Sequence, residues 1–373
     1  MTATVITDPA DLTGDRGAWD ALAVDASRPY SAPGWLLPWW SAVRPAGSEF
    51  RAVAVRDRAG LAGLAAFHVS RDRLGITTWA LLGGGASSHL EPLARPGALG
   101  SVATAVAQAL RTDGADMLSL AAVPRDSPWP ALLRDAWPAR RPRLSLVTSL
   151  RAPYVDVPDG GYEAWFASRS QGFRRQTRGL RRELARRGGG LRRAVTPAEV
   201  TAGLAELERL HRRRWDHRGG SQALTEPVAT MLRQVAAELP PTRFQVWTAV
   251  ADGATIAAAL FLTAGAEMHA WISGFDPAWA RWSPSLVLND EIIRYAAETG
   301  HRRVSLGPGS APYKDRLATG EELLDWVDLL PHGRRYPYVR LCQSPYRLYR
   351  VTAARTPPRV KRRIRRVLGS GPA

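Results

Sequence analysis

The segment FQVWTAVADGATIAAALFLTAGAEMHAWISGF covers residues 244–275 and is the most strand-like part of this 373-residue chain. β-branched, aromatic and small aliphatic residues dominate it, as is typical of strands that lie in a sheet. Asp252-Gly253 within it is a hairpin turn signal. We therefore predict three consecutive antiparallel strands, at residues 244–251, 254–264 and 267–275.

A helix and a fourth strand follow this segment. Ser283-Pro284 is typical of a helix start, because Pro fits the first helical turn, and Gly300 is typical of the residue after a helix end. RVSLG at 303–307 has the composition of a short strand. The order predicts an α/β (α+β) unit in which helices flank a mixed, mainly antiparallel sheet.

An earlier part of the chain repeats this order. It contains three strand-like runs, a helix pattern and a fourth strand-like run, at 51–57, 61–70, 75–83, 97–112 and 115–123. The match lies in order and spacing more than in identity, so chance similarity of common α/β pieces is the alternative. The repeat predicts two tandem halves of similar architecture.

The length of the chain also favours two domains. We predict an N-terminal half at 1–150, a C-terminal half at 151–335 and a basic C-terminal tail at 336–373. The second half is expected to be the catalytic one. In the first half a long loop, GGGASSHLEPLARPG at 83–97, stands where the second half has its Ser-Pro helix start.

The charge of the chain points to an anionic partner. It carries 51 basic and 34 acidic residues, a formal net charge of +17, and its cations cluster at 169–193 and 355–366. Residues 162–187 predict one amphipathic helix with an Arg-rich outer face, which suits a phosphate-bearing acceptor or tRNA. A solvated basic surface is the alternative. The tail pattern at 359–368 fits either an anionic membrane surface or a disordered basic segment.

Other features exclude whole classes of function. The N-terminal residues MTATVITDPADL lack the pattern of a secretory signal, and the longest apolar stretch, 254–264, is too short for a membrane span. Cys342 is the only cysteine, which excludes an intrachain disulfide and a Cys-based metal cluster. We therefore expect a cytoplasmic protein without a metal.

The helix start at Ser283 and Pro284 is the sharpest candidate site. Ser283 is expected to cap the helix, and the first-turn amides are expected to point outward unpaired, namely those of Ser285, Leu286 and Val287. Such a helix start, with the helix dipole behind it, binds phosphate or pyrophosphate. Asp290 and Glu291, one turn or more into the helix, are expected to be solvated or to act as caps.

At this point the sequence resembles a known family. Four segments carry the resemblance: LHRRRW (210–215), ISGFD (272–276), SPSLVLNDEIIRYAAETG (283–300) and GPGSAPYK (307–314). They look like the GNAT acyltransferases, and more specifically the CelD-type enzymes of exopolysaccharide and cellulose gene clusters. The family is also similar to the FemAB-type aminoacyltransferases, which pair two GNAT-like halves. The family usually has Gly where this chain has Ser285, and often an acid where it has Ser305.

The resemblance implies an acyl-CoA as co-substrate. In GNAT proteins CoA pyrophosphate lies on the helix start, which corresponds here to Ser283 and its neighbours. A backbone amide of the preceding strand meets the thioester carbonyl, and Ile272 and Ser273 are the residues we select by position. The implied reaction moves an acyl group to the amine or hydroxyl of a small or sugar acceptor, for exopolysaccharide or cell-envelope synthesis at the inner face of the membrane.

Four residues are candidates for direct participation in that reaction: His211, His269, Tyr313 and Lys314. The two histidines are candidate bases because imidazole titrates near neutral pH, although a core position is the alternative for His211. Lys314 is one of only two lysines in this Arg-rich chain, which favours a need for a compact ammonium over a surface position.

The acceptor is expected to contact a second set of residues: Arg214, Trp215, Gly307 and Gly309. Arg214 suits a carboxylate or phosphate, and Trp215 offers an apolar wall or belongs to the core. Two alternatives to the acyl-CoA reaction stay open. One is a FemAB-like transferase that uses aminoacyl-tRNA, and the other is a non-enzymatic basic protein that binds membranes or nucleic acid.

Overall fold

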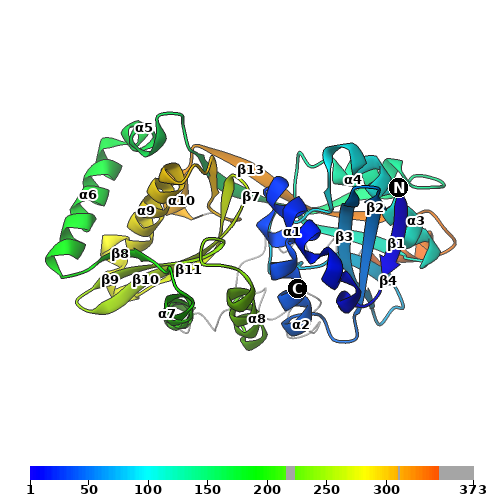
Figure 1. The fold of residues 1–373 in the computed structure, drawn as a ribbon, viewed down its shortest axis with the longest axis horizontal. Helices are drawn as coiled ribbons and strands as arrows, with labels where there is room; N and C mark the ends of the chain where they lie inside the picture. The colour runs from blue at the N-terminus through cyan, green and yellow to red at the C-terminus, as the bar shows by residue number, and fades with distance from the viewer. Residues whose placement is uncertain (216–222, 310, 344–373) are drawn as a thin grey trace.

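The computed structural model describes residues 1–215, 223–309 and 311–343. Within these residues, thirteen strands form one sheet in the order β1-β2-β3-β4-β6-β13-β7-β12-β11-β10-β9-β8, with β5 paired to β3. Helices cover the sheet in two lobes (Figure 1). The predicted mixed, mainly antiparallel α/β architecture with flanking helices is confirmed, but the sheets of the two halves are continuous with each other.

The first lobe contains the N-terminal strands and helices. Its strands are β1 (Thr2–Ile6), β2 (Glu49–Asp57), β3 (Gly60–Arg71), β4 (Thr77–Leu81), β5 (Leu93–Ala94) and β6 (Met117–Pro124). Its helices are α1 (Arg16–Asp25), α2 (Pro33–Ala42), α3 (Leu99–Thr112) and α4 (Trp129–Asp135). β4 and β6 are parallel and are joined through α3, whereas β2, β3 and β4 are antiparallel.

The second lobe repeats this arrangement around a later part of the chain. Its strands are β8 (Gly190–Arg193), β9 (Phe244–Ala251), β10 (Ala254–Ala264), β11 (Glu267–Phe275) and β12 (Arg303–Ser305). Its helices are α5 (Gly161–Ser168), α6 (Gln171–Arg186), α7 (Pro197–Trp215), α8 (Glu226–Glu238), the 3₁₀ helix η5 (Pro277–Trp282), α9 (Pro284–Glu298) and α10 (Pro312–Leu317). All strands and helices that the sequence predicted in the repeat are present within a few residues.

Two long strands connect the lobes, and the sequence analysis predicted neither. β7 (Arg143–Asp156) follows the first lobe in sequence but pairs with β12 of the second. β13 (Gly320–Leu330) follows the second lobe but pairs with β6 of the first. The two strands also pair with each other along their length (Figure 1). Each lobe therefore completes its sheet with a strand from the other part of the chain.

The Arg-rich segment at 162–187 differs from its prediction as one helix. It forms α5 and α6, separated at Arg169, whose backbone is extended. Ser170 starts the second helix, because its hydroxyl accepts a hydrogen bond from the Phe173 amide at 3.2 Å. The predicted apolar face is correct, since Phe173, Thr177, Leu180 and Leu184 are all buried.

Two apolar cores stabilise the lobes. Large side chains such as Trp19, Trp35 and Trp79 fill the first, and Trp165 and Phe173 fill the second. Each such side chain contributes about 3–5 kcal/mol, judged by the usual cost of its truncation to Ala. Residues of α7 and α8 belong to the first core although they come from the second half of the sequence, and α8 packs beside α2. The lobes therefore share packing as well as strands.

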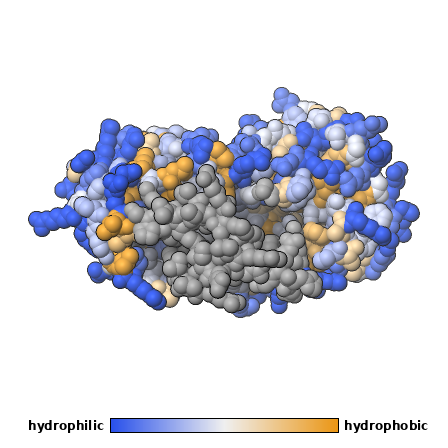
Figure 2. All heavy atoms as spheres, turned by 180° about the vertical axis from the view of Figure 1, so that it is seen from behind, coloured by the Kyte–Doolittle hydropathy of each residue, from blue (hydrophilic) through white to orange (hydrophobic). Residues whose placement is uncertain are grey.

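The surface shown in Figure 2 is largely hydrophilic, with hydrophobic residues scattered between charged ones. Among the described residues, no helix combines the length and the apolar composition that a bilayer crossing requires. The predicted membrane-facing tail at 359–368 lies outside the residues that the structure describes.

Candidate functional site

The sheet opens between β11 and β12. These parallel strands pair only at Glu267 with Arg303, Met268 with Val304, and His269 with Ser305. β11 then continues to Phe275 along β10, with a bulge at Trp271. Because the carboxyl ends of the two parallel strands separate, the sheet has an opening beyond His269, and such openings are the usual ligand sites of α/β sheets.

Ile272 and Ser273 lie on the edge of this opening. The described register pairs them with Leu260 and Ala259 of β10 and with no residue of β12. Consecutive residues of a strand direct their N–H groups to opposite sides. One of these two amides therefore faces the opening, where the prediction placed the contact with a thioester carbonyl.

The start of α9 lies at the same end of the strands. Ser283 adopts a left-handed backbone, with φ 51° and ψ 54°, and does not cap the helix with its side chain. The Leu286 amide donates to the Ser283 carbonyl at 2.9 Å, so the expectation that all three first-turn amides are unpaired is wrong for Leu286. Strained backbone of this kind is concentrated at functional sites.

The first turn of α9 is covered rather than open to solvent. Pro284, Ser285, Leu286 and Val287 are all buried. Ser285 Oγ is buried without a hydrogen-bond partner among the described residues. A buried hydroxyl without a partner is costly, and a bound polar group would satisfy it.

α6 packs over α9 through a buried ion pair. Arg181 contacts Asp290 and Glu291 at 2.6 Å each, and the Tyr162 hydroxyl donates to Asp290 Oδ1 at 3.0 Å. The Asp290 side chain is 0% exposed, so its predicted solvated or capping role is wrong. Burial raises the pKa of Asp290, and Arg181 opposes that rise. The pair fixes the Arg-rich helix against the helix start.

The Gly-Pro-Gly turn closes the base of the opening. Gly307 has φ 76°, and a Cβ at that position would lie 3.0 Å from the Ala270 carbonyl oxygen of β11. Gly309 has φ 91°, and its amide donates to the Arg151 carbonyl at 2.8 Å. The two glycines therefore allow the turn to approach β11 where β12 leaves it.

Lys314 is held at this turn. It lies in α10 and is 8% exposed, so a surface position is excluded. Its Nζ donates to the carbonyls of Gly307 at 2.9 Å and Pro308 at 3.0 Å. Burial lowers the pKa of Lys314 from 10.5 to about 8. The preceding residue, Tyr313, is half-buried on the same short helix.

His269 is enclosed at the last paired position of β11. It is 1% exposed, and its Nε2 lies 3.0 Å from Glu267 Oε2. Burial lowers the pKa of His269 to about 4, although Glu267 opposes this. The rings of Tyr30 and His89 pack edge-on against it, with centroids 5.9 Å and 4.6 Å away.

His89 belongs to the loop of the first lobe and was not predicted to take part in a site. Its Nε2 lies 2.9 Å from Glu322 of β13, and its Nδ1 lies 3.1 Å from Ser88 Oγ. Tyr30, also from the first lobe, donates to the Ala270 carbonyl at 3.2 Å. Groups from the first lobe therefore border the opening of the second, and only their long-range packing reveals it.

His211 occupies a different place from His269. It is 4% exposed on α7, which packs directly on β11 at Gly274. A Cβ on Gly274 would lie 2.9 Å from the His211 amide nitrogen, so only glycine allows this contact. Arg214 and Trp215 end the same helix, and their side chains lie outside the described part of the structure.

An open groove of about 730 Å³ lies beside the start of α9. α6 forms one side with Arg182 and Arg186, and η5 forms the other with Arg281 and Trp282. Among the described residues that line it, none is acidic. Gln176 of α6 also lines it and donates to Ser283 Oγ at 3.4 Å, which places the groove next to the helix start.

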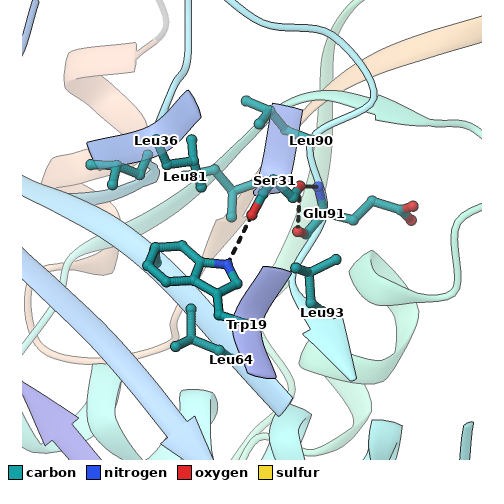
Figure 3. Close-up of a pocket in the computed structure, with 10 residues that line it drawn as sticks. Trp19, Ser31, Leu36, Leu64, Leu81, Leu90, Glu91 and Leu93 are labelled. Atoms are coloured by element: carbon teal, nitrogen blue, oxygen red, sulfur yellow. Dashed lines mark hydrogen bonds between the residues drawn. The ribbon is translucent and has the colours of Figure 1, made fainter. Parts of the chain in front are cut away.

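A second cavity is too small for a ligand. It has a volume of about 10 Å³ and lies between leucines of the first core (Figure 3). Trp19 Nε1 donates to the Ser31 carbonyl at 2.9 Å at its edge. Such a volume holds one water at most, so this cavity is part of the packing. In the described part of the chain, no cluster of His, Cys, Asp and Glu side chains is arranged to hold a metal.

Comparisons with known proteins agree with the geometry of the second lobe. The sequence model of the acetyltransferase (GNAT) domain family matches residues 171–315. No curated protein matches the chain in sequence. The matched range contains α6, β11, α9, β12 and Lys314, which together form the opening and its surroundings.

Several solved structures share the fold over most of the chain. The crystal structure of FemX has 12% identity and a TM-score of 0.64, with 91% of this chain and 99% of that chain covered. The C-terminal domain of a putative lysylphosphatidylglycerol synthetase from Agrobacterium fabrum has 12% identity and a TM-score of 0.56, with 88% and 94% covered. L-PGS from Bacillus licheniformis has 11% identity and a TM-score of 0.53, with 89% and 95% covered.

At these identities the likeness shows the fold and nothing finer. The chain thus has a GNAT-like α/β fold and carries a GNAT-type acetyltransferase domain at residues 171–315.

Proposed function

We propose that the protein transfers an acyl group from an acyl-CoA to an amine or hydroxyl of a small or sugar acceptor. The observation that carries this proposal is the opening between β11 and β12, with the buried Lys314 ammonium at its base. A thioester arm fits such an opening, because the edge of β11 offers it unpaired backbone groups. The pyrophosphate would then lie at the start of α9, where the dipole and the remaining amides favour an anion.

The reaction needs stabilisation of the oxyanion that forms when the acceptor attacks the thioester. The amide of Ile272 or Ser273 that faces the opening supplies one hydrogen bond to this oxygen. The acceptor nitrogen or oxygen forms a bond to the acyl carbon, the carbon–sulfur bond breaks, and the thiolate takes up the proton that the acceptor loses. Lys314, charged below its pKa of about 8, adds a cation near the same place.

The histidines are less suited to direct contact with substrate. His269 is 1% exposed and His211 is 4% exposed, so neither reaches the acceptor without movement of its surroundings. We therefore assign them positioning roles in the proposed mechanism. Tyr313 is half-buried beside Lys314 and remains a candidate for contact with the acceptor, together with Gly307, Gly309, Arg214 and Trp215.

The cellular role proposed is the one that the CelD-type resemblance implies. In it, the acceptor is a glycan or a glycan precursor of exopolysaccharide or cell-envelope synthesis. The protein would act in the cytoplasm, at the inner face of the membrane. The net charge of +17 supports contact with an anionic surface or substrate there.

A second candidate function is transfer from aminoacyl-tRNA. The FemAB-type resemblance implies it, and the arginines of α6 favour it, because this helix carries six arginines and one glutamate. This alternative expects RNA to co-purify with the protein and CoA compounds not to bind. The acyl-CoA proposal expects the opposite in the same preparation.

A thermal-shift panel of acyl-CoAs tests the proposal. A ligand at 100-fold excess over its Kd stabilises the folded state by about 2.7 kcal/mol, which raises Tm by several degrees. Ser283→Glu places a negative charge at the start of α9 and is expected to abolish this shift. The matched control is Gly100→Glu in the first turn of α3, an exposed position of the first lobe, which should leave the shift unchanged. Absence of any shift in the natural sequence would overturn acyl-CoA dependence.

A further inference from the structure

The groove between α6 and η5 has the chemistry of a phosphate-binding site. Three guanidinium groups line it, those of Arg182, Arg186 and Arg281, and no described lining residue is acidic. Arg186 pairs with Glu183, but that carboxylate is also held by Arg187 at 2.7 Å. Arg182 and Arg281 have no acidic partner within the described residues. The groove therefore retains a positive charge that a ligand would neutralise.

The walls of the groove also accept a flat, partly apolar group. Trp282 lines one side, and the Arg281 guanidinium lies 5.1 Å from the centroid of its ring. Gly179 lies on the facing helix, and a Cβ there would meet no atom within 4 Å, so the helix face has room. A guanidinium and an indole on one wall, opposite a smooth helix face, suit a nucleotide better than a bare phosphate.

The position of the groove relates it to the donor. Arg281 and Trp282 immediately precede Ser283 and the start of α9, and Gln176 bridges α6 to the Ser283 hydroxyl. In the proposed function the thioester arm enters the β11/β12 opening and the pyrophosphate lies at the start of α9. The rest of CoA beyond the pyrophosphate is an adenosine with a 3′-phosphate. The groove continues from the pyrophosphate position on the side away from the opening.

We propose that this groove binds the 3′-phosphorylated adenosine of the acyl donor, with Arg182 and Arg186 on the 3′-phosphate. The inference rests on the proposed acyl-CoA function and names a part of the donor that the start of α9 alone would not select. α6 is fixed in place for this task by the buried contact of Arg181 with Asp290, so its outward arginines are presented on a rigid helix. Rigid presentation lowers the entropy cost of binding.

Isothermal titration of the full chain with CoA and with 3′-dephospho-CoA tests the proposal. We expect CoA to bind at least about 10-fold more tightly, the usual effect of two charge-assisted contacts that only one ligand makes. The double variant Arg182→Gln/Arg186→Gln should weaken CoA binding to the level of 3′-dephospho-CoA. The same variant should leave 3′-dephospho-CoA binding within about 3-fold of its original value.

A matched control separates the groove from the overall charge. Arg175→Gln/Arg192→Gln removes the same two positive charges from exposed positions that do not line the groove, one on α6 and one on β8. This variant should keep the preference for CoA. Equal affinity of the natural sequence for the two compounds would overturn the groove assignment and leave the acyl-CoA function standing. So would a double groove variant that weakens both compounds equally.

Failure of the function itself gives a different result. If neither CoA nor 3′-dephospho-CoA binds the natural sequence, acyl-CoA dependence and the groove assignment are both wrong. Retained RNA in that preparation would then favour the aminoacyl-tRNA alternative. Far-ultraviolet circular dichroism of each variant shows that it is folded before its binding is compared.

Discussion

The two lobes open their sheets at the same place and fill the openings differently. β4 and β6 pair in parallel over three residues, as β11 and β12 do. In the first lobe the Leu90 amide donates to the Ala122 carbonyl of β6 at 3.3 Å, so a loop spans the opening. In the second lobe a helix starts beside the opening and a glycine turn with Lys314 forms its base. One topology can thus hold a plugged opening or an accessible one, depending on the segment after the third strand.

Loss of the clamp between α6 and α9 should have the largest effect on stability. Asp290→Ala leaves Arg181 without its main partner and the Tyr162 hydroxyl without its acceptor. We expect the free energy of unfolding to fall by about 3–5 kcal/mol, as is usual when one member of a buried ion pair is removed. Urea denaturation measures this. Glu291→Ala is the control, because that side chain is 27% exposed, and it should cost below about 1 kcal/mol. Equal costs would show that the clamp is not specific to the second lobe.

Lys314 should make the stability of the protein rise with pH above neutrality. Its pKa is about 8 in the folded protein and 10.5 otherwise, so between these values the unfolded chain binds a proton that the folded one does not. The free energy of unfolding therefore increases from pH 8 towards 10.5, by on the order of 2–3 kcal/mol. Lys314→Met should lack this increase. Parallel curves for the two proteins between pH 7.5 and 9.5, roughly the lower part of that window, would contradict the buried ammonium.

One partly or fully buried histidine in each lobe should make the protein sensitive to acid. Burial lowers the pKa of His68 on β3 and of His269 on β11 to about 4 each. Both are neutral in the folded protein, and the unfolded chain takes up a proton below about 6.5. Stability is therefore fully present above that pH and is lost as the pH falls towards 4. Each group accounts for on the order of 2 kcal/mol.

Chemical denaturation at pH 5 and at pH 7 tests this expectation in both lobes. His68→Gln and His269→Gln should each reduce the difference in stability between the two pH values, and their effects should add. Lack of any reduction in one variant would show that the histidine of that lobe is solvated.

The smallest expected effect concerns the contact of the first-lobe loop with β11. Trp271 Nε1 donates to the Ala86 carbonyl at 2.7 Å. Trp271→Phe removes this bond and should cost about 1 kcal/mol. Hydrogen exchange should then be faster at the Leu90 amide while amides of β9 and β10 keep their protection. Unchanged exchange at Leu90 would mean that the loop is held by its own lobe alone.

Local patterns predicted the repeated elements well. Residues 244–275 form three strands at the predicted positions, and Thr196 and Glu199 form the reciprocal hydrogen bonds of a helix cap. These features depend on neighbours in sequence. β7 escaped prediction because its pattern is not a clean alternation, with Leu146 57% exposed and Leu150 42% exposed.

The candidate site was predicted in part. Lys314 stood out by composition, and its burial at the glycine turn explains why a compact ammonium fits there. The contacts of His89 with Glu322 and with His269 were beyond reach, because the first pair is 233 residues apart in the chain. The burial of Asp290 depends on α6, whose packing direction no periodicity in α9 could reveal.

The exchange of β7 and β13 determines when the molecule can fold during synthesis. β6 is complete near residue 124, but the strand that covers its free edge ends at residue 330. Until that strand emerges, the first lobe has an uncovered sheet edge, which is a template for wrong pairing. Long-range pairing of this kind also slows folding. The two lobes are therefore expected to mature together, so that a ribosome-bound intermediate of either one is a natural client for chaperones.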